Sequence, residues 1–372
     1  MTSNLPRRRA ERRGLRLWPV GTVLTLAFAG AIAVAAAVFF AGWDLLGAQG
    51  LKPERQLTSS TLFDLVKLSF GVVAGAGALV ALVVAYRRQR VDEDGALRDA
   101  TRLHTERFTT AVSQLGEESA AVRLGGVHAL AGLANDAPTR DLRQTCIDVL
   151  CAYLRLPYTA EADLPSGDAE ARHAYLALRE VRHTVIRLIR DHLRLAPEHP
   201  HSWQGHDLDF TGVVFDGGNF SCAVFSGGRV DFRDAVFSSG MVDFGFARFS
   251  SGMVHFNGAV FSGGTVHFDH AAFSGGTVTF ISAEFSGGTV AFDHAKFSGG
   301  TVIFRGGEFS GGTVRFDRAE CGNVDFVNAR FTGGTVDFSS AAGVAPSGLV
   351  PSGGQPLPNG LSLPQAWCPP TP

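Results

Sequence analysis

The chain has 372 residues, with 33 Lys and Arg against 35 Asp and Glu, and 45 Gly. This length allows two or three domains, and the near-zero net charge excludes a protein that is basic throughout and binds nucleic acid by charge alone. Charge and Phe are unevenly distributed, however. Residues 1–90 have a net charge of +8, residues 207–341 have −6, and 23 of the 29 Phe lie between positions 210 and 338. Each segment therefore needs its own physical explanation.

Residues 1–16 form a basic leader, and residues 17–90 are predicted to form a two-helix transmembrane hairpin. Residues 17–43 and 68–85 contain no charged side chain. A helix of roughly 20 apolar residues is long enough to cross the hydrocarbon core of a bilayer. A cleaved signal peptide is the alternative for the first segment, but its apolar stretch is longer than such peptides have.

The basic residues predict the orientation of this hairpin. Six Arg precede the first span, and Arg87, Arg88 and Arg90 follow the second, whereas the loop between the spans contains only Lys52 and Arg55. Since Lys and Arg accumulate on the cytoplasmic side, we expect a multi-pass protein of the bacterial inner membrane with both termini in the cytoplasm.

Small residues in the second predicted span allow close helix contact. Gly71, Gly75 and Gly77 would suit a defined helix pair or a homo-oligomer, although an anchor without a specific partner explains them equally well. Asp64 and Lys67 lie one helical turn apart at the outer end of this span and could form an ion pair there. We interpret them as ordinary interfacial residues rather than as a functional ionisable site.

Residues 91–200 have the pattern of amphipathic helices, predicted at 93–115, 119–134, 140–155 and 168–195. Ser119 and Thr139 are the expected N-caps of the second and third helices. The apolar stripe expected in the first helix consists of Leu97, Leu103, Phe108, Ala111, Val112 and Leu115. The segments 106–116 and 122–130 resemble a HEAT-like helix pair found beside repeat domains in bacterial membrane proteins, a resemblance that implies no catalytic motif.

The Phe residues from 210 to 338 recur first in steps of five and then in alternating steps of seven and five, with Cys321 in the one missing position. A small or β-branched residue, such as Val230 or Ala235, stands two positions before nearly every Phe. A step of five matches neither the period of a strand nor that of a helix. It fits short strands joined by tight turns, which form the sides of a coil with Phe pointing inward.

Units such as Leu208-Asp-Phe-Thr-Gly, Val213-Val-Phe-Asp-Gly and Ala223-Val-Phe-Ser-Gly resemble those of the pentapeptide-repeat family, over residues 207–341. The resemblance implies an all-β solenoid, the right-handed quadrilateral β-helix. One departure is systematic, because most Phe-Ser-Gly units carry two extra residues, as in residues 261–266. If these widen two of the four corners, one coil takes 24 residues, and His270 stacks with His294 on one face beside Asp269 and Asp293.

Chemical motifs are scarce, and we assign no catalytic, cofactor-binding or metal-binding residue and expect no cofactor. His199, His201 and His206 could ligate a metal, but no partner motif completes the site and a solvated linker explains them better. The His270 and His294 strip is either a binding or pH-sensitive patch or a plain polar face. Cys222 and Cys321 are expected to be small core or corner residues, and no CxxC pattern indicates a disulfide or metal site.

Residues 342–372 carry no charge and contain 8 of the 16 Pro. Since the open ends of a β-solenoid need covers, we expect part of this tail to fold back and place Trp367 or its Leu residues on the last coil without adding another. A disordered tail is the alternative. At the front, the helix ending near Leu195 and Trp203 is the expected cover.

The sequence therefore predicts a multidomain membrane protein that is not an enzyme and presents its solenoid as an interaction module in the cytoplasm. Its expected partners are the lipid bilayer and an unidentified cytoplasmic or membrane protein. Some proteins of the resembled family mimic DNA and bind topoisomerase. That alternative is disfavoured by a solenoid with a net charge of only −6, and a nucleic-acid partner is not expected. A small channel or sensor is a further alternative.

Overall fold

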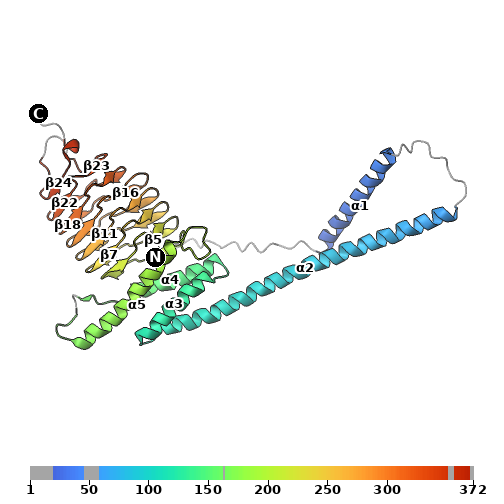
Figure 1. The fold of residues 1–372 in the computed structure, drawn as a ribbon, viewed down its shortest axis with the longest axis horizontal. Coiled ribbons are helices and arrows are strands. Elements are labelled where there is room, and N and C mark those ends of the chain that lie inside the picture. The colour runs from blue at the N-terminus through green and yellow to red at the C-terminus, as the bar shows by residue number, and fades with distance from the viewer. Residues whose placement is uncertain (1–19, 46–57, 162–163, 351–355, 369–372) are drawn as a thin grey trace, which may run out of the picture. The chain divides into compact units, whose positions relative to one another are not determined.

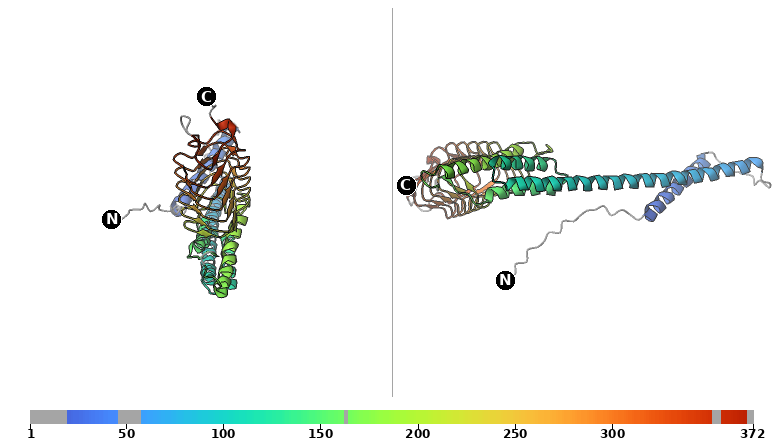
Figure 2. Two further views of the ribbon diagram at one scale, coloured as in Figure 1. Left: turned by 90° about the vertical axis from the view of Figure 1, so that its left-hand side faces the viewer. Right: turned by 90° about the horizontal axis from the view of Figure 1, so that it is seen from below.

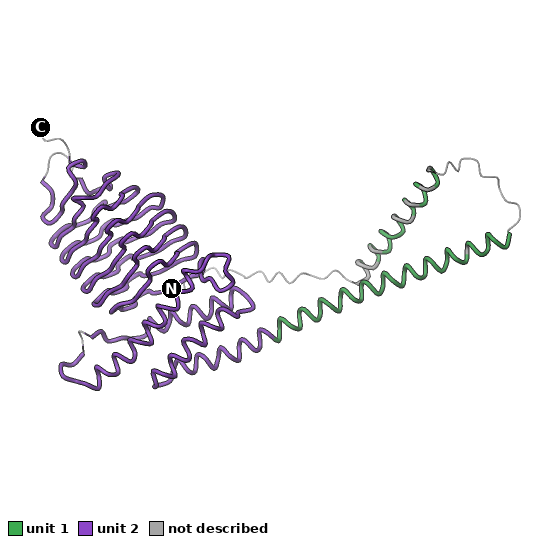
Figure 3. Tube along the Cα trace, viewed as in Figure 1, with its two compact units in different colours: residues 1–99 green, residues 100–372 purple. Residues whose placement is uncertain are grey.

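The computed structural model describes residues 20–45, 58–161, 164–350 and 356–368. They form two compact units, residues 1–99 and 100–372, which are described separately (Figure 3). The predicted basic leader, and the loop that contains Lys52 and Arg55, lie outside the described residues.

The first unit contains α1 (Val20–Leu45) and the beginning of α2 (Ser59–Leu115) (Figure 1). Among the described residues, α2 is the one helix that is long and apolar enough to cross a membrane by length and composition. We predicted a break between residues 85 and 93, and this was wrong because α2 is continuous there. Residues 86–92 contain no Pro or Gly, and the Gln89 side chain donates a hydrogen bond to Glu93 one turn later, at 3.1 Å.

The second unit begins with the end of α2 and continues with α3 (Ala120–Asn135), α4 (Arg140–Arg155) and α5 (Ala169–Leu193). These bounds lie within one or two residues of those predicted. The hydroxyl of Thr139 caps α4 by accepting a hydrogen bond from the N–H of Leu142 at 3.3 Å, whereas Ser119 precedes α3 without a side-chain cap.

The inward side of α2 in the second unit differs in part from the predicted stripe. Ala111 and Leu115 are buried as expected and Phe108 packs against the core, but the next residue on this face is the buried His104. Leu103 is 47% exposed and Val112 is 37% exposed, so these two assignments were wrong, as was Leu97 at 49% exposed. Positions 104, 108, 111 and 115 follow the helical period, and a polar residue at the first of them concealed the correct face.

The rest of the second unit is a parallel β-solenoid of about six turns with four sides (Figures 1 and 2). The strands of the first side are β1 (Leu208–Asp209), β5 (Arg229–Asp231), β9 (Met253–His255), β13 (Thr277–Thr279), β16 (Thr301–Ile303) and β20 (Val324–Asp325). Those of the second side are β2 (Val214–Phe215), β6 (Val236–Phe237), β10 (Val260–Phe261), β14 (Glu284–Phe285), β17 (Glu308–Phe309) and β21 (Arg330–Phe331).

The third and fourth sides complete each coil. The strands of the third side are β3 (Gly218–Asn219), β7 (Met241–Asp243), β11 (Thr265–His267), β15 (Thr289–Ala291), β18 (Thr313–Arg315), β22 (Thr335–Asp337) and β24 (Leu361–Ser362). Those of the fourth side are β4 (Val224–Phe225), β8 (Arg248–Phe249), β12 (Ala272–Phe273), β19 (Glu320–Cys321) and β23 (Ala342–Gly343). Single bridges of Lys296 to Ala272 and to Glu320 make the fourth side continuous.

The register confirms the predicted coil length through the middle of the solenoid. Val254 pairs with Val278 and Val266 pairs with Val290, each 24 residues apart. Toward the ends the offset falls to 22, as between Leu208 and Val230, because one corner there lacks the two extra residues.

The Phe side chains form four stacked columns inside the coils. Phe268, for example, lies between Phe244 and Phe292 with ring centroids 4.8 Å away on either side. One column is 210, 232, 256, 280, 304 and 326, the next 215, 237, 261, 285, 309 and 331, the third 220, 244, 268, 292, 316 and 338, and the fourth 225, 249, 273 and 297. Burial of each Phe contributes about 1.5–3 kcal/mol, so the columns are the main stabilising element.

The extra residues lie at corners, as predicted. Gly264 has a φ of +65°, and a Cβ at this position would overlap the carbonyl oxygen of Gly240 in the coil below. A Cβ at the preceding Gly263 would overlap the carbonyl oxygen of Ser238. The paired Gly therefore allow successive coils to approach each other at the widened corner.

Both ends of the solenoid are covered. At the front, α4 packs on β1 and α5 packs on β3, with Trp203 fully buried. At the back, the Trp367 indole N–H donates to the carbonyl of Gly343 at 3.1 Å, and its ring lies 5.8 Å from that of Phe338. The tail also adds strands, because β24 pairs with β22 and β23 with β19, which contradicts our expectation that it would not extend the coil. The Pro residues flank these short strands and leave the pairing N–H groups available.

Candidate functional site

The most distinctive exposed feature of the solenoid is a column of corner residues between its third and fourth sides, Phe246, His270, His294 and Arg318, here called the corner column. All four have left-handed backbone conformations, with φ between 53° and 57°. Such a conformation is uncommon for residues other than Gly and Asn. It recurs every 24 residues because each residue closes the same turn in successive coils.

The side chains of the corner column stack in the way the sequence predicted for its histidines. The rings of His270 and His294 lie 4.7 Å apart and are inclined by 6°. Phe246, whose side chain is 60% exposed, continues the stack on His270 at 4.7 Å and 8°. The column therefore presents a row of ring edges to solvent, a surface suited to contact with aromatic, apolar or guanidinium groups of a partner.

The acidic residues beside the corner column are engaged in contacts within the solenoid. Asp269 pairs with His267 at 2.9 Å, and Asp293 pairs with Arg315 at 2.6 Å. Asp317 accepts a hydrogen bond from the Ser340 hydroxyl. Much of the negative charge on this face is therefore balanced locally rather than presented to a cationic ligand.

The three histidines considered as metal ligands do not converge. His199 Nδ1 accepts a hydrogen bond from the N–H of His201, and their rings are 5.3 Å apart, whereas His206 is buried with its Nδ1 2.9 Å from Gln144 Oε1. Burial, together with the positive charges of Arg140 and Arg143, lowers the pKa of His206 to about 4. Within the described ranges, no group of three or more His, Cys, Asp or Glu could hold a metal ion.

The cysteines occupy the kinds of positions expected for the repeat. Cys321 is buried in the position that Phe takes in the other coils, where burial raises the pKa of its thiol to about 12. Cys222 is an exposed corner residue, and all five cysteines have free thiols. Burial likewise raises the pKa of Cys146, which lies 3.8 Å from Nε2 of the buried His104, to about 11. The buried thiols are therefore poor nucleophiles.

Sequence reasoning missed a buried polar cluster between the helices and the first coil. The carboxylate of Asp216, whose side chain is only 2% exposed, accepts hydrogen bonds from the hydroxyls of Tyr158 at 2.5 Å and Tyr175 at 2.6 Å. His183 and Arg179 lie 3.3 Å from its two oxygens. The cluster thus connects α5 and the segment before it to the corner that follows β2.

The hydrogen bonds of this cluster decide the charge of its carboxyl group. Burial alone would raise the pKa of Asp216, but hydrogen bonds from His183, Tyr158 and Tyr175 outweigh it and hold the pKa far below its usual range. Burial and the bond to Asp216 raise the pKa of Tyr175 to about 12. Asp216 is therefore ionised and both tyrosines are neutral donors near neutral pH.

A signal for this cluster exists in the sequence. Asp216 follows Phe215, and the equivalent positions of the next coils are Ser238, Ser262, Ser286 and Ser310. A carboxylate in place of a repeated Ser marks the coil that contacts another element. Its partners, however, lie 33–58 residues earlier in the chain and have no motif of their own.

The polar pair in the first unit lies as expected, since Lys67 Nζ donates to Asp64 Oδ1 at 3.2 Å. Gly71, Gly75 and Gly77 lie on α2, and a Cβ added at any of them would meet nothing within 4 Å. The close helix contact suggested for these glycines is therefore not made within the described residues.

Comparison with known proteins gives no identification, because no protein-family model, curated protein or solved structure matches this chain. The functional argument consequently depends on the repeat pattern, the solenoid and the surface described above.

Proposed function

We propose that this protein is a membrane-anchored, non-enzymatic interaction module, and that its solenoid is the right-handed quadrilateral β-helix of the pentapeptide-repeat family. The observation that carries the proposal is the solenoid itself, with four internal Phe columns and covers at both ends. Its interior is filled by side chains, so its outward faces are what it offers to other molecules. Repeat proteins commonly use such extended faces for binding.

The location belongs to the same proposal. The apolar part of α2, the uncharged segment 17–43 and the surrounding Arg support two spans in the bacterial inner membrane, with both termini in the cytoplasm. Reporter fusions after Arg90 and within residues 47–58 test this arrangement. An exterior signal from the Arg90 fusion would overturn it.

We propose the corner column as the main contact with a protein partner. Phe246 is a large exposed side chain held in a fixed conformation by its stack on His270. Exposed aromatic residues in rigid settings are typical anchors of interfaces. The local pairing of Asp269 and Asp293 argues against a DNA-mimicking surface, which needs dense uncompensated negative charge.

The experiment is proximity labelling in membranes with the full chain and two matched variants. The first variant, F246N/H270N/H294N, removes the rings, and Asn tolerates the left-handed backbone at these corners. The control variant, D234N/S282N, changes two corners between the first and second sides that have the same backbone conformation, where Asn328 already occurs naturally. We expect partners to be lost with the first variant and retained with the control, and equal labelling by both would refute the assignment.

A further inference from the structure

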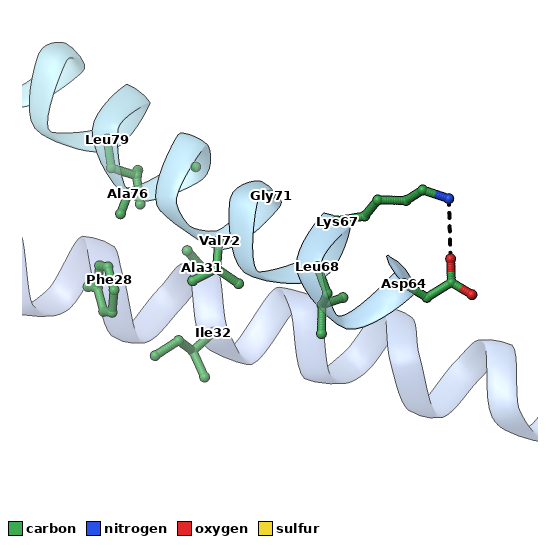
Figure 4. Close-up of a pocket in the computed structure, with 11 residues that line it drawn as sticks. Phe28, Ala31, Ile32, Asp64, Lys67, Leu68, Gly71, Val72, Ala76 and Leu79 are labelled. Atoms are coloured by element: carbon green, nitrogen blue, oxygen red, sulfur yellow. Dashed lines mark hydrogen bonds and ion pairs between the residues drawn. The ribbon is translucent and has the colours of Figure 1, made fainter. Parts of the chain in front are cut away.

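An apolar groove of about 730 Å³ lies between α1 and α2 in the first unit (Figure 4). Its volume falls in the range of roughly 300–1,000 Å³ that is usual for small-molecule sites. One wall comes from α1 and the other from α2. The apolar lining consists of Phe28, Ala31 and Ile32 on α1 and of Leu68, Gly71, Val72, Gly75, Ala76 and Leu79 on α2.

The groove is long and narrow. Its lining on α2 runs from Asp64 to Leu79, which at 1.5 Å per residue corresponds to about 22 Å. This exceeds the depth of one leaflet, which is half of a hydrocarbon core of about 30 Å. Gly71 and Gly75 keep the α2 wall open, because a Cβ at either position would enter empty space. The shape fits an extended acyl chain.

One end of the groove is ionic. Asp64 and Lys67 line it there and pair with each other at 3.2 Å, with side chains 73% and 74% exposed (Figure 4). Inside a bilayer an acyl chain gains little by leaving its neighbours for an apolar groove, since both surroundings are equally apolar. The choice of lipid must therefore come from the charged end, which offers one negative and one positive group.

We propose that this groove holds one acyl chain of a zwitterionic phospholipid that carries an ammonium headgroup. The ammonium of the lipid pairs with the Asp64 carboxylate, and its phosphate pairs with the Lys67 ammonium, so the lipid exchanges the internal ion pair for two new ones. An anionic phospholipid could use Lys67 but would be repelled by Asp64. This inference rests on the membrane location proposed above.

The test measures lipid bound to the purified full chain in detergent, offered phosphatidylethanolamine and phosphatidylglycerol in equal amounts, by native mass spectrometry. The variants G71L and G75L fill the groove without a steric clash at Cβ. G77L is the matched control, because Gly77 has an equally open Cβ position but does not line the groove. D64N removes the negative charge from the ionic end and leaves Lys67 in place.

We expect the wild type and G77L to retain phosphatidylethanolamine at least fivefold over phosphatidylglycerol, and G71L and G75L to lose most of it. D64N should shift the preference toward phosphatidylglycerol. Equal retention by G71L, G75L and G77L, or an unchanged preference in D64N, would overturn the inference. Membrane fractionation of the same variants separates the two proposals: protein that fractionates with membranes but shows no groove-dependent lipid refutes the lipid site alone, whereas protein absent from membranes refutes the proposed location.

Discussion

Replacement of Phe268 by Ala tests the assignment of the Phe columns as the stabilising core. Its side chain is 0% exposed, with stacked neighbours at 4.8 Å on both sides and edge contacts to Phe256 and Phe280 at 6.0 and 6.1 Å. Truncation of a buried Phe costs about 3–5 kcal/mol, and loss of each stacked pair adds about 0.5–1.5 kcal/mol. Because these contributions overlap, we expect a local destabilisation of about 4 kcal/mol.

Hydrogen exchange measured by mass spectrometry on the full chain in detergent reports this change locally. Since about 1.4 kcal/mol corresponds to a factor of ten, the amides of β7, β11 and β15 should exchange about a thousandfold faster. The effect should fade toward the covered ends, because each coil contacts only its neighbours.

The matched control is Thr265→Ala on β11, three residues before Phe268. Thr265 is half-buried and faces outward, so its replacement should change the free energy of opening by less than about 1 kcal/mol. Equal acceleration of exchange in both variants would refute the inward and outward assignment.

Three further predictions concern the covered ends. His206 has a lowered pKa, so the neutral form stabilises the fold fully above about pH 6.5 and this contribution, on the order of 3 kcal/mol, is lost as the pH falls toward 4; His206→Asn should flatten that dependence in thermal unfolding. Tyr175→Phe should destabilise the contact of α5 with the solenoid by about 1–3 kcal/mol, seen as faster exchange in α5, while Tyr153→Phe should be nearly neutral because the Tyr153 hydroxyl has no hydrogen-bond partner in the described part of the chain. Deletion of residues 342–372 should expose β22 and cause aggregation in light scattering, and unchanged solubility and thermal stability would refute the role of the tail as a cover.

Local patterns determined much of the solenoid from the sequence alone. The Phe spacing predicted which residues point inward, and the paired Gly predicted where the corners widen, because both depend on interactions within a coil or between adjacent coils. The 24-residue register followed from the same periodicity, as did the stack of His270 on His294. Helix bounds near Thr139 and Asp168 were readable for the same reason, since an N-cap acts within its own first turn.

Tertiary structure decided the features that join distant segments. The Asp216 cluster brings together side chains up to 58 residues apart, and no local preference encodes that meeting. His104 occupies the inner face of α2 because Cys146 lies opposite it, which the helical period could not reveal. The tail adds β24 beside β22 because unpaired N–H and C=O groups at the last coil favour a strand wherever the chain can supply one between its Pro residues. Periodicity thus specifies the repeating interior, whereas the ends and junctions depend on which segments of the folded chain meet there.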